Sequence, residues 1–163
     1  MSQVVDVIGA QMTPQISKNE ALIRGGCLMQ SKHISADEAA IRDLVESWAR
    51  AVRSKDLSSI LAHHSEDMLM FDVPPPLESR GLEAYRQTWN LFYSSQPEPI
   101  AFDIQRMHVV SGSDVAFVAA LMQCAETGKD GERIKLDFRL TIGLRKIGDH
   151  WTVVHEHHSI PAT

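Results

Sequence analysis

Two pairs of polar residues near the end of the sequence have the types and the spacing for acid–base chemistry. Asp137 and Arg139 are two residues apart in one strand-like run, and Glu156 and His158 are two apart in another. Residues two apart share a face of a β-strand, so each pair presents its polar groups on one side. If the two runs are antiparallel neighbours, carboxylate, guanidinium and imidazole groups come together, which suits general acid–base catalysis.

Other residue patterns exclude several kinds of chemistry. His155 and His157 share a strand face, but zinc needs a third or fourth ligand and no carboxylate stands with them at a familiar interval, so we predict no metal site. Cys27 and Cys124 lack CxxC spacing and are expected to be reduced thiols. The sequence has no Walker loop, dinucleotide-binding fingerprint or nucleophile elbow, so we predict no cofactor and neither a nucleotide-driven nor a serine-hydrolase mechanism.

The composition is that of an ordinary globular protein. The chain has 163 residues, 44% of them hydrophobic and 23% charged, which is enough for one domain with a buried core. Its formal net charge of -5 argues against nucleic acid or an anionic membrane as a partner. No apolar run approaches the roughly 20 residues of a membrane span, and the first residues lack the features of a secretory signal. We therefore expect a cytoplasmic protein.

Three amphipathic helices are predicted in the first part of the domain. A capping box that begins at Ser35 starts the first helix, and the second begins after Asp56 with His64 on its apolar side. The third carries Tyr85 and Trp89 in one stripe. These side chains either belong to the core or line a pocket that opens beside the helices.

Strand-like runs dominate the rest of the domain, which we assign to residues 34–163, with residues 1–33 as an extension. A short strand before a proline loop is followed by four longer runs, at 68–72, 100–110, 115–126, 133–147 and 150–160 in all. Helices followed by such a meander indicate an α+β fold. We expect a cone-shaped barrel of curved antiparallel sheet with helices packed over one face, enclosing an apolar pocket.

The strand that carries Asp137 and Arg139 has a polar face and an apolar face, and two orientations are open. The apolar face consists of Leu136, Phe138, Leu140, Ile142 and Leu144. Either the polar face looks into the pocket and the apolar face is a subunit interface, or the apolar face packs on the helices and the polar face meets water. The length of the apolar face favours the first arrangement, because one small pocket does not require it and a dimer would cover it.

The order of these features resembles the SnoaL-like and ketosteroid-isomerase-like branch of the nuclear transport factor 2-like superfamily. The matching features are Trp48 late in the first helix, Lys55-Asp56-Leu57 at the second, Asp72 before a proline loop and Arg80-Gly81 at the third. The run Trp151–Pro161 also looks like the last strand of SnoaL-like proteins and of the association domain of calcium/calmodulin-dependent kinases. The resemblance covers about residues 35–161 and implies the same fold.

This resemblance also implies roles for individual residues. Ketosteroid isomerases use an Asp as general base and a Tyr and a protonated Asp as oxyanion donors. Asp72 lies in the segment that resembles the one with the base, and Asp137 in the segment that resembles the one with the protonated Asp. Trp48 stands where the family has its tyrosine, and an indole N–H donates a hydrogen bond but does not titrate. The resemblance thus implies that the polar strand face, with Arg139 and Glu156, looks into the pocket.

Two functions follow from the residues and the resemblance together. The first is a cofactor-independent enzyme of the isomerase, polyketide cyclase or dehydratase type, acting on a small apolar carbonyl compound. Asp72 would be its base, and Asp137 with Trp48 or His158 would stabilise the oxyanion. The expected substrate-binding residues are Trp48, His64, Tyr85, Trp89, Arg139 and Glu156. The alternative is a non-catalytic ligand-binding or oligomerisation module in which Arg139 holds a carboxylate-bearing ligand. In either case we expect a homodimer.

Overall fold

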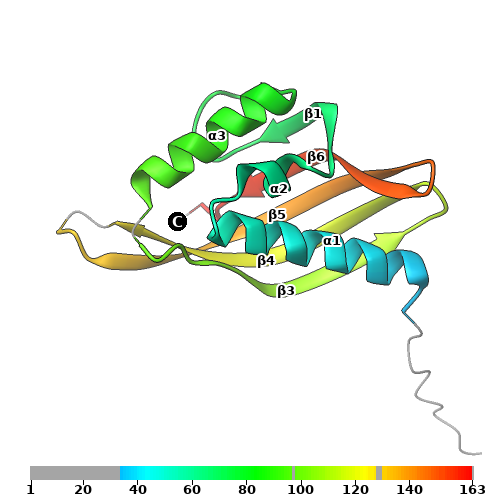
Figure 1. Ribbon diagram of the computed structural model, residues 1–163. Coiled ribbons are helices and arrows are strands. Elements are labelled where there is room, and N and C mark those ends of the chain that lie inside the picture. Colours follow the sequence, from blue (N-terminus) through cyan, green and yellow to red (C-terminus); the bar gives the residue numbers. More distant parts are fainter. Residues whose placement is uncertain (1–33, 97, 128–129, 163) are drawn as a thin grey trace, which may run out of the picture. The chain divides into compact units, whose positions relative to one another are not determined.

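The computed structural model describes residues 34–96, 98–127 and 130–162 (Figure 1). The expected extension, residues 1–33, lies outside the described residues, so the division of the chain into extension and domain stays a prediction. The elements are α1 (Ala36–Arg53), α2 (Leu57–Leu61), β1 (His64–Phe71), β2 (Ser79–Arg80), α3 (Leu82–Ser95), β3 (Phe102–Ser111), β4 (Val115–Thr127), β5 (Arg133–Ile147) and β6 (His150–Ser159). This order confirms the predicted α+β class.

The predicted capping box begins α1. The hydroxyl of Ser35 accepts a hydrogen bond from the backbone N–H of Glu38 at 3.0 Å, which satisfies one of the free donors of the first turn. Ile41, Val45 and Trp48 lie on the buried face of the helix. Burial of this apolar stripe against the sheet, rather than helix propensity alone, stabilises α1.

The second helix is shorter than predicted, and His64 is not part of it. α2 ends at Leu61, and His64 is the first residue of β1. The change of structure is fixed by pairing with the last strand, because the backbone N–H of Val153 donates to the carbonyl of His63 at 2.8 Å. His64 therefore points into the core from a strand, where it is buried.

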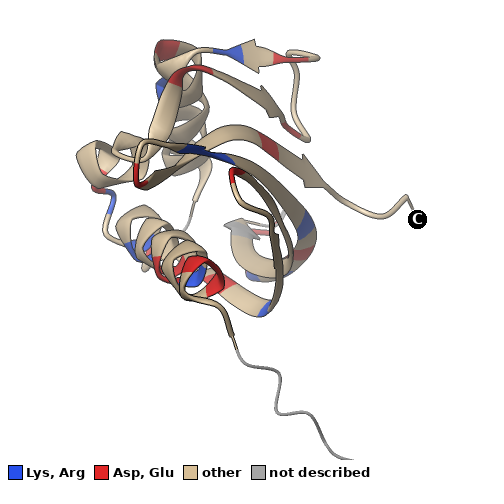
Figure 2. Ribbon diagram, turned by 90° about the vertical axis from the view of Figure 1, so that its right-hand side faces the viewer, with Lys and Arg blue, Asp and Glu red and all other residues tan. Residues whose placement is uncertain are grey.

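The six strands form one curved sheet in the order β2-β1-β6-β5-β4-β3. The last four strands form an antiparallel meander, as predicted, but β1 pairs with β6 in parallel, and the sheet is open with β2 and β3 at its edges. Figures 1 and 2 show the helices on the inner side of this curve. The helices therefore cover the inner face of the curved sheet.

The apolar face of β5 packs under the helices. Phe138, Leu140, Ile142 and Leu144 are buried, whereas Asp137 and Arg139 are exposed on the opposite face. The prediction that the polar face looks into the pocket is thus wrong, and the alternative arrangement is the one observed. The physical reason is the hydrophobic effect, because the helices remove the long apolar face of β5 from water.

A β-bulge in β6 interrupts the alternation of its two faces. Leu144 of β5 pairs with Val153 and Gly143 pairs with His155, so Val154 is an extra residue between them. Because of this residue, Val153 and Glu156 both point inward, although simple alternation puts them on opposite faces. The approach is close at this point, since a Cβ atom at Gly143 would lie 3.3 Å from that of His155.

Candidate functional site

A pocket of about 480 Å³ lies between α3, the proline loop after β1 and the inner face of the sheet. Its lining is mostly apolar and consists of Met70, Val73, Pro74, Pro75, Pro76, Ser79, Thr88, Trp89, Leu91, Phe92, Ser95, Gln96, Phe102, Cys124, Leu136, Phe138 and Ile160, together with Asp72 and His158. The volume is in the range of pockets that bind small organic molecules.

Asp72 and His158 lie side by side in the wall of this pocket. Oδ1 of Asp72 is 3.3 Å from Nδ1 of His158 and accepts a hydrogen bond from the backbone N–H of Val73 at 2.8 Å. The parallel register places them together, because Phe71, directly before Asp72, pairs with His157, directly before His158. The side chain of Asp72 is 21% exposed and that of His158 is 9% exposed. The pair can therefore exchange protons with a molecule in the pocket.

Behind this pair, a buried carboxylate holds the other side of the imidazole. Oε2 of Glu156 is 3.6 Å from Nε2 of His158. Oε1 of Glu156 accepts hydrogen bonds from Nε2 of His64 at 2.7 Å and from the Tyr85 hydroxyl at 2.8 Å. The Tyr85 oxygen in turn accepts a hydrogen bond from the indole N–H of Trp48 at 3.0 Å. Side chains of α1, α3, β1 and β6 thus converge on one carboxylate, which we call the Glu156 network.

The network fixes the charges of its members. Burial alone would raise the pKa of Glu156, but hydrogen bonds and charges of His158 and His64 outweigh burial and lower this pKa to about 2. Burial alone would lower the pKa of His158, but Asp72 and Glu156, one on each side of the ring, raise it to about 9. Burial and the neighbouring Glu156 carboxylate raise the pKa of Tyr85 well above its ordinary value. At neutral pH the buried pair is therefore an ionised Glu156 and an imidazolium at His158.

The predicted site residues fall into three groups: residues that line the pocket, residues of the Glu156 network, and residues on the outer face of the sheet. Asp72, His158 and Trp89 line the pocket. Trp48, His64, Tyr85 and Glu156 belong to the Glu156 network and do not line it.

Asp137 and Arg139 lie on the outer face of the sheet, away from the pocket. Oδ1 of Asp137 accepts a hydrogen bond from the side-chain amide of Gln123 at 2.8 Å, across the β4–β5 ladder. Arg139 is paired in register with Leu121 and Ser159. Neither side chain can reach a molecule in the pocket from this face, which removes the oxyanion donor and the carboxylate anchor that the sequence analysis assigned to them.

Several pocket residues have no distinguishing signature in the sequence. Phe102 and Phe138 were not distinguished from core residues, because an apolar residue on a strand gives the same pattern in both places. Gln96 follows α3, and its Oε1 is buried without a hydrogen-bond partner among the described residues. No periodicity marks a single glutamine at a helix end, so only its position in three dimensions identifies it.

The described residues include neither a metal-binding cluster nor a membrane-spanning helix. Among them there is no group of three or more His, Cys, Asp or Glu side chains arranged to hold a metal ion. In the same part of the chain, no helix is long and apolar enough to cross a membrane.

Solved structures with the same fold are numerous. An NTF2-like protein of unknown function from Pseudomonas putida KT2440 is 31% identical, with a TM-score of 0.70 over 78% of this chain and 89% of that one. A ketosteroid isomerase-like protein from Erwinia carotovora atroseptica is 18% identical, with a TM-score of 0.66 over 79% of this chain and 99% of that one. The association domain of C. elegans CaMKII is 21% identical, with a TM-score of 0.61 over 77% of this chain and 96% of that one.

No curated protein matches the sequence. A family model described as the SnoaL-like domain matches residues 41–163, which include all of the pocket and of the Glu156 network. The chain therefore belongs to the SnoaL-like domain family.

Proposed function

We propose that this protein is a cofactor-independent enzyme that performs acid–base chemistry on a small apolar carbonyl compound, of the isomerase, cyclase or dehydratase type. The observation that supports this proposal is the contact of Asp72 and His158, 3.3 Å apart, in the wall of a mostly apolar pocket. A carboxylate beside an imidazolium can take a proton from the carbon next to a carbonyl group.

Asp72 is the proposed general base. Its Oδ1 is engaged by His158 and by the N–H of Val73, which leaves Oδ2 for a substrate proton. The proton leaves the carbon next to the carbonyl group for Asp72, and the electron pair of the C–H bond moves to the carbonyl oxygen as an enolate. Return of the proton from Asp72 to another carbon isomerises the substrate. Transfer of that proton from Asp72 to a β-hydroxyl group instead lets the hydroxyl leave as water while the enolate electrons form the new carbon–carbon double bond, which dehydrates the substrate.

His158 is proposed to hold Asp72 in place and to stabilise the enolate by its positive charge. Trp48 does not have the role expected of it, because its N–H donates to Tyr85 behind the pocket. Trp48, Tyr85, His64 and Glu156 are therefore proposed as positioning residues that act through His158.

A non-catalytic module is the second candidate, and the exposed face of the sheet supports it. This face carries the exposed apolar side chains of Val110, Phe117 and Leu121, on β3 and β4. The similar structures include an association domain, which agrees with a protein that assembles with copies of itself. We propose a homodimer through this outer face, in place of the apolar face of β5 that the sequence analysis assigned to the interface.

The two candidates differ in turnover. Enones, β-hydroxy ketones and polyketide-like ketones are to be tested as substrates, with the Asp72→Asn variant and, as matched control, Asp137→Asn on the outer face. We expect Asp72→Asn to abolish turnover while the protein stays folded by circular dichroism, and Asp137→Asn to retain turnover. Unaltered turnover of Asp72→Asn would remove Asp72 from the mechanism. Binding of these compounds by the wild-type protein without any turnover would favour the binding module.

A further inference from the structure

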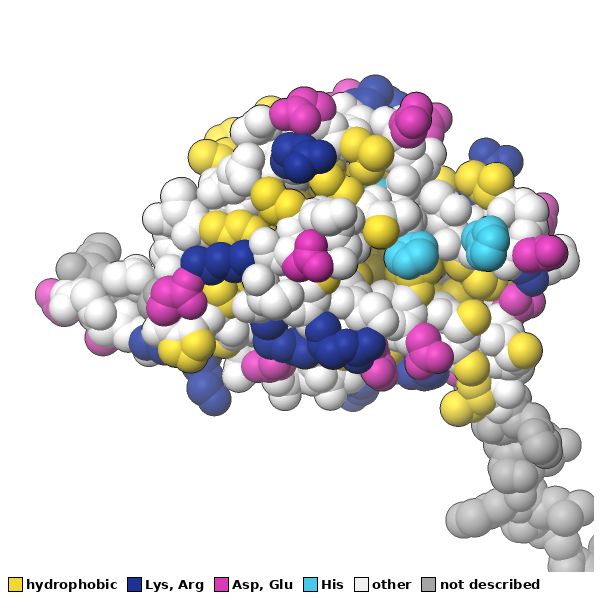
Figure 3. All heavy atoms as spheres, in the orientation of Figure 1, with side chains coloured by type: hydrophobic (Ala, Val, Ile, Leu, Met, Phe, Trp, Pro, Cys, Tyr) yellow, Lys and Arg dark blue, Asp and Glu magenta, His cyan; other side chains and the backbone are white. Residues whose placement is uncertain are grey.

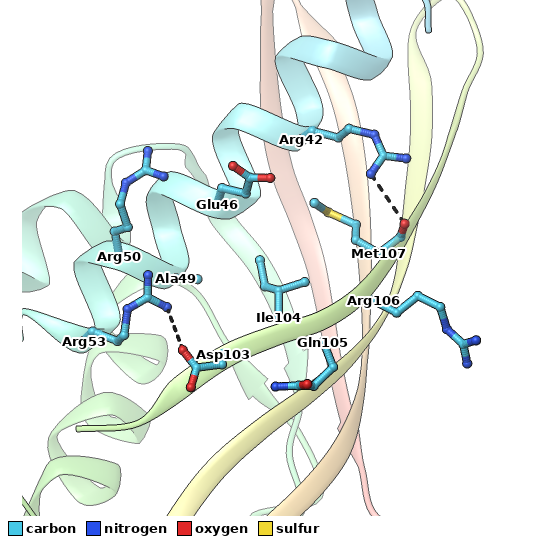
Figure 4. Close-up of a pocket in the computed structure, with 10 residues that line it drawn as sticks. All are labelled: Arg42, Glu46, Ala49, Arg50, Arg53, Asp103, Ile104, Gln105, Arg106 and Met107. Atoms are coloured by element: carbon cyan, nitrogen blue, oxygen red, sulfur yellow. Dashed lines mark hydrogen bonds and ion pairs between the residues drawn. The ribbon is translucent and has the colours of Figure 1, made fainter. Parts of the chain in front are cut away.

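A second hollow, of about 430 Å³, runs between α1 and β3 and shares no lining residue with the pocket (Figure 4). Four of the residues that line it are arginines, in a chain with a formal net charge of -5. We call it the arginine groove and define it by Arg42, Arg50 and Arg53 of α1 and residues 103–107 of β3. Figure 3 shows Lys and Arg side chains gathered, together with a few acidic ones, over this part of the surface.

Three of the four arginines come from one stripe of α1, and Arg106 comes from β3. Positions 42, 46, 50 and 53 are four, four and three residues apart, so their side chains project from the same side of the helix. Two of them are held by the edge strand of the sheet: Nη1 of Arg53 donates to the carbonyl of Phe102 at 2.6 Å, and Nη1 of Arg42 donates to that of Met107 at 3.4 Å. The guanidinium groups at both ends of the groove are thus in place before any ligand binds.

The two ends of the groove differ in charge. Arg42 pairs with Glu38 at 2.9 Å, which neutralises that end. At the other end Arg53 lies 3.5 Å from Asp103, whereas Arg50 donates only to the hydroxyl of Ser47 at 2.8 Å among the described residues. This end therefore has two guanidinium groups and one carboxylate, and its excess positive charge is exposed to solvent.

The floor and the middle of the groove restrict what can lie there. Ala49, Ile104 and Met107 provide an apolar floor next to the charged end. Glu46 stands between Arg42 and Arg50 on the same stripe and has no ion-pair partner among the described residues. A ligand with several negative charges along its length would be repelled there, which disfavours a nucleic acid or another polyanion.

We propose that the arginine groove binds a small molecule with a single oxyanion head group, a carboxylate or a phosphate, at Arg50 and Arg53, and with its apolar body on Ala49, Ile104 and Met107. Guanidinium groups bind both oxyanions through paired hydrogen bonds. This site is independent of the proposed enzymatic pocket.

The test is an NMR titration of the full chain with hexanoate, with hexyl phosphate and with inorganic phosphate, following the backbone amides of α1 and β3. Arg50→Gln is the informative variant, because Arg50 makes no hydrogen bond to β3 and its removal leaves the contacts of Arg53 and Arg42 intact. Arg106→Gln is the matched control, since the Arg106 side chain points away from α1 in Figure 4. The wild-type protein should show saturable shifts at residues 46–53 and 103–107.

We expect Arg50→Gln to weaken binding by about tenfold to a hundredfold, the usual effect of losing a hydrogen bond to a charged group, and Arg106→Gln by less than about twofold. Tighter binding of hexanoate or of hexyl phosphate then identifies the head group, and tighter binding of either than of inorganic phosphate supports the apolar floor. The proposal is overturned by the absence of saturable shifts in the groove, by shifts confined to pocket residues such as Phe138, or by equal weakening in the two variants.

Discussion

Replacing Glu156 by glutamine should lower the pKa of His158 while the buried shape of the network is kept. Oε2 of Glu156 is 3.6 Å from Nε2 of His158, and at an effective dielectric constant of about 20 two unit charges at this distance interact by about 4.6 kcal/mol. That energy corresponds to about three pH units in a pKa. We expect the amide to recover part of it, so the pKa of His158 should fall from about 9 to the neighbourhood of the ordinary value, 6.5.

The assay is an NMR titration of the His158 ring from mildly acidic to alkaline pH, which needs no substrate. Asp137→Asn is the control, because Asp137 lies on the outer face of the sheet and should leave the pKa of His158 unchanged. A His158 pKa that stays near 9 in Glu156→Gln, or that falls equally in Asp137→Asn, would refute the argument from the buried carboxylate.

Three more predictions concern stability and assembly. Folding raises the pKa of His158, so the protonated ring stabilises the fold fully below pH 6.5 and this effect is lost as the pH rises through about 9. The free energy of unfolding, measured with urea, should fall by about 3 kcal/mol over this range. A free energy of unfolding that does not change with pH would contradict the prediction. Tyr85→Phe should lower the free energy of unfolding by about 1–3 kcal/mol, because Trp48 Nε1 and Glu156 lose a buried partner, and chemical denaturation measures this; a variant as stable as the wild type would mean that these hydrogen bonds contribute nothing net. Phe117→Asp on the outer face should convert the proposed dimer to a monomer, which light scattering measures. The control is Leu77→Asp on the proline loop, where the residue is 94% exposed, and it should leave the dimer intact. A dimer that survives Phe117→Asp places the interface elsewhere.

The helices and the fold class could be predicted because their determinants are local. The hydroxyl of Ser35 caps α1 as its sequence position indicates, and Tyr85 and Trp89 are both buried on α3 as their helical spacing requires. The antiparallel meander follows from turns between long strand-like runs. In each case the pattern and the structure it produces lie within a few residues of one another.

The direction of each sheet face could not be predicted, because it depends on elements far away in the chain. β5 has one apolar and one polar face, and this pattern is equally consistent with a core under the helices and with a subunit interface. Only the packing of α1 and α3 decides between them. Because the apolar face of β5 packs on the helices, Asp137 and Arg139 lie outside the pocket and Phe138 lines it.

The location of His158 and Glu156 depends on two irregularities that have no signature in the sequence. The bulge at Val154 turns both residues toward the helices while Val153, on the other side of the bulge, stays inside. The parallel pairing of β1 with β6 then brings Asp72 to His158. Without the extra residue in β6, either Val153 or the pair Glu156 and His158 would face solvent.

Burial of these charges has a cost that the network only partly offsets. The Glu156 side chain is 1% exposed, and within the described part of the chain its Oε2 has no hydrogen bond, only the 3.6 Å contact with His158. A hydrophobic residue of the same size would fill this position without the desolvation penalty of a carboxylate. A buried carboxylate that raises the pKa of the one histidine in the pocket wall is hard to explain by stability alone, and departures from local rules of this kind cluster at functional sites. The buried Glu156, which does not line the pocket, is therefore stronger support for a function of His158 than the family resemblance of the segment around Asp72.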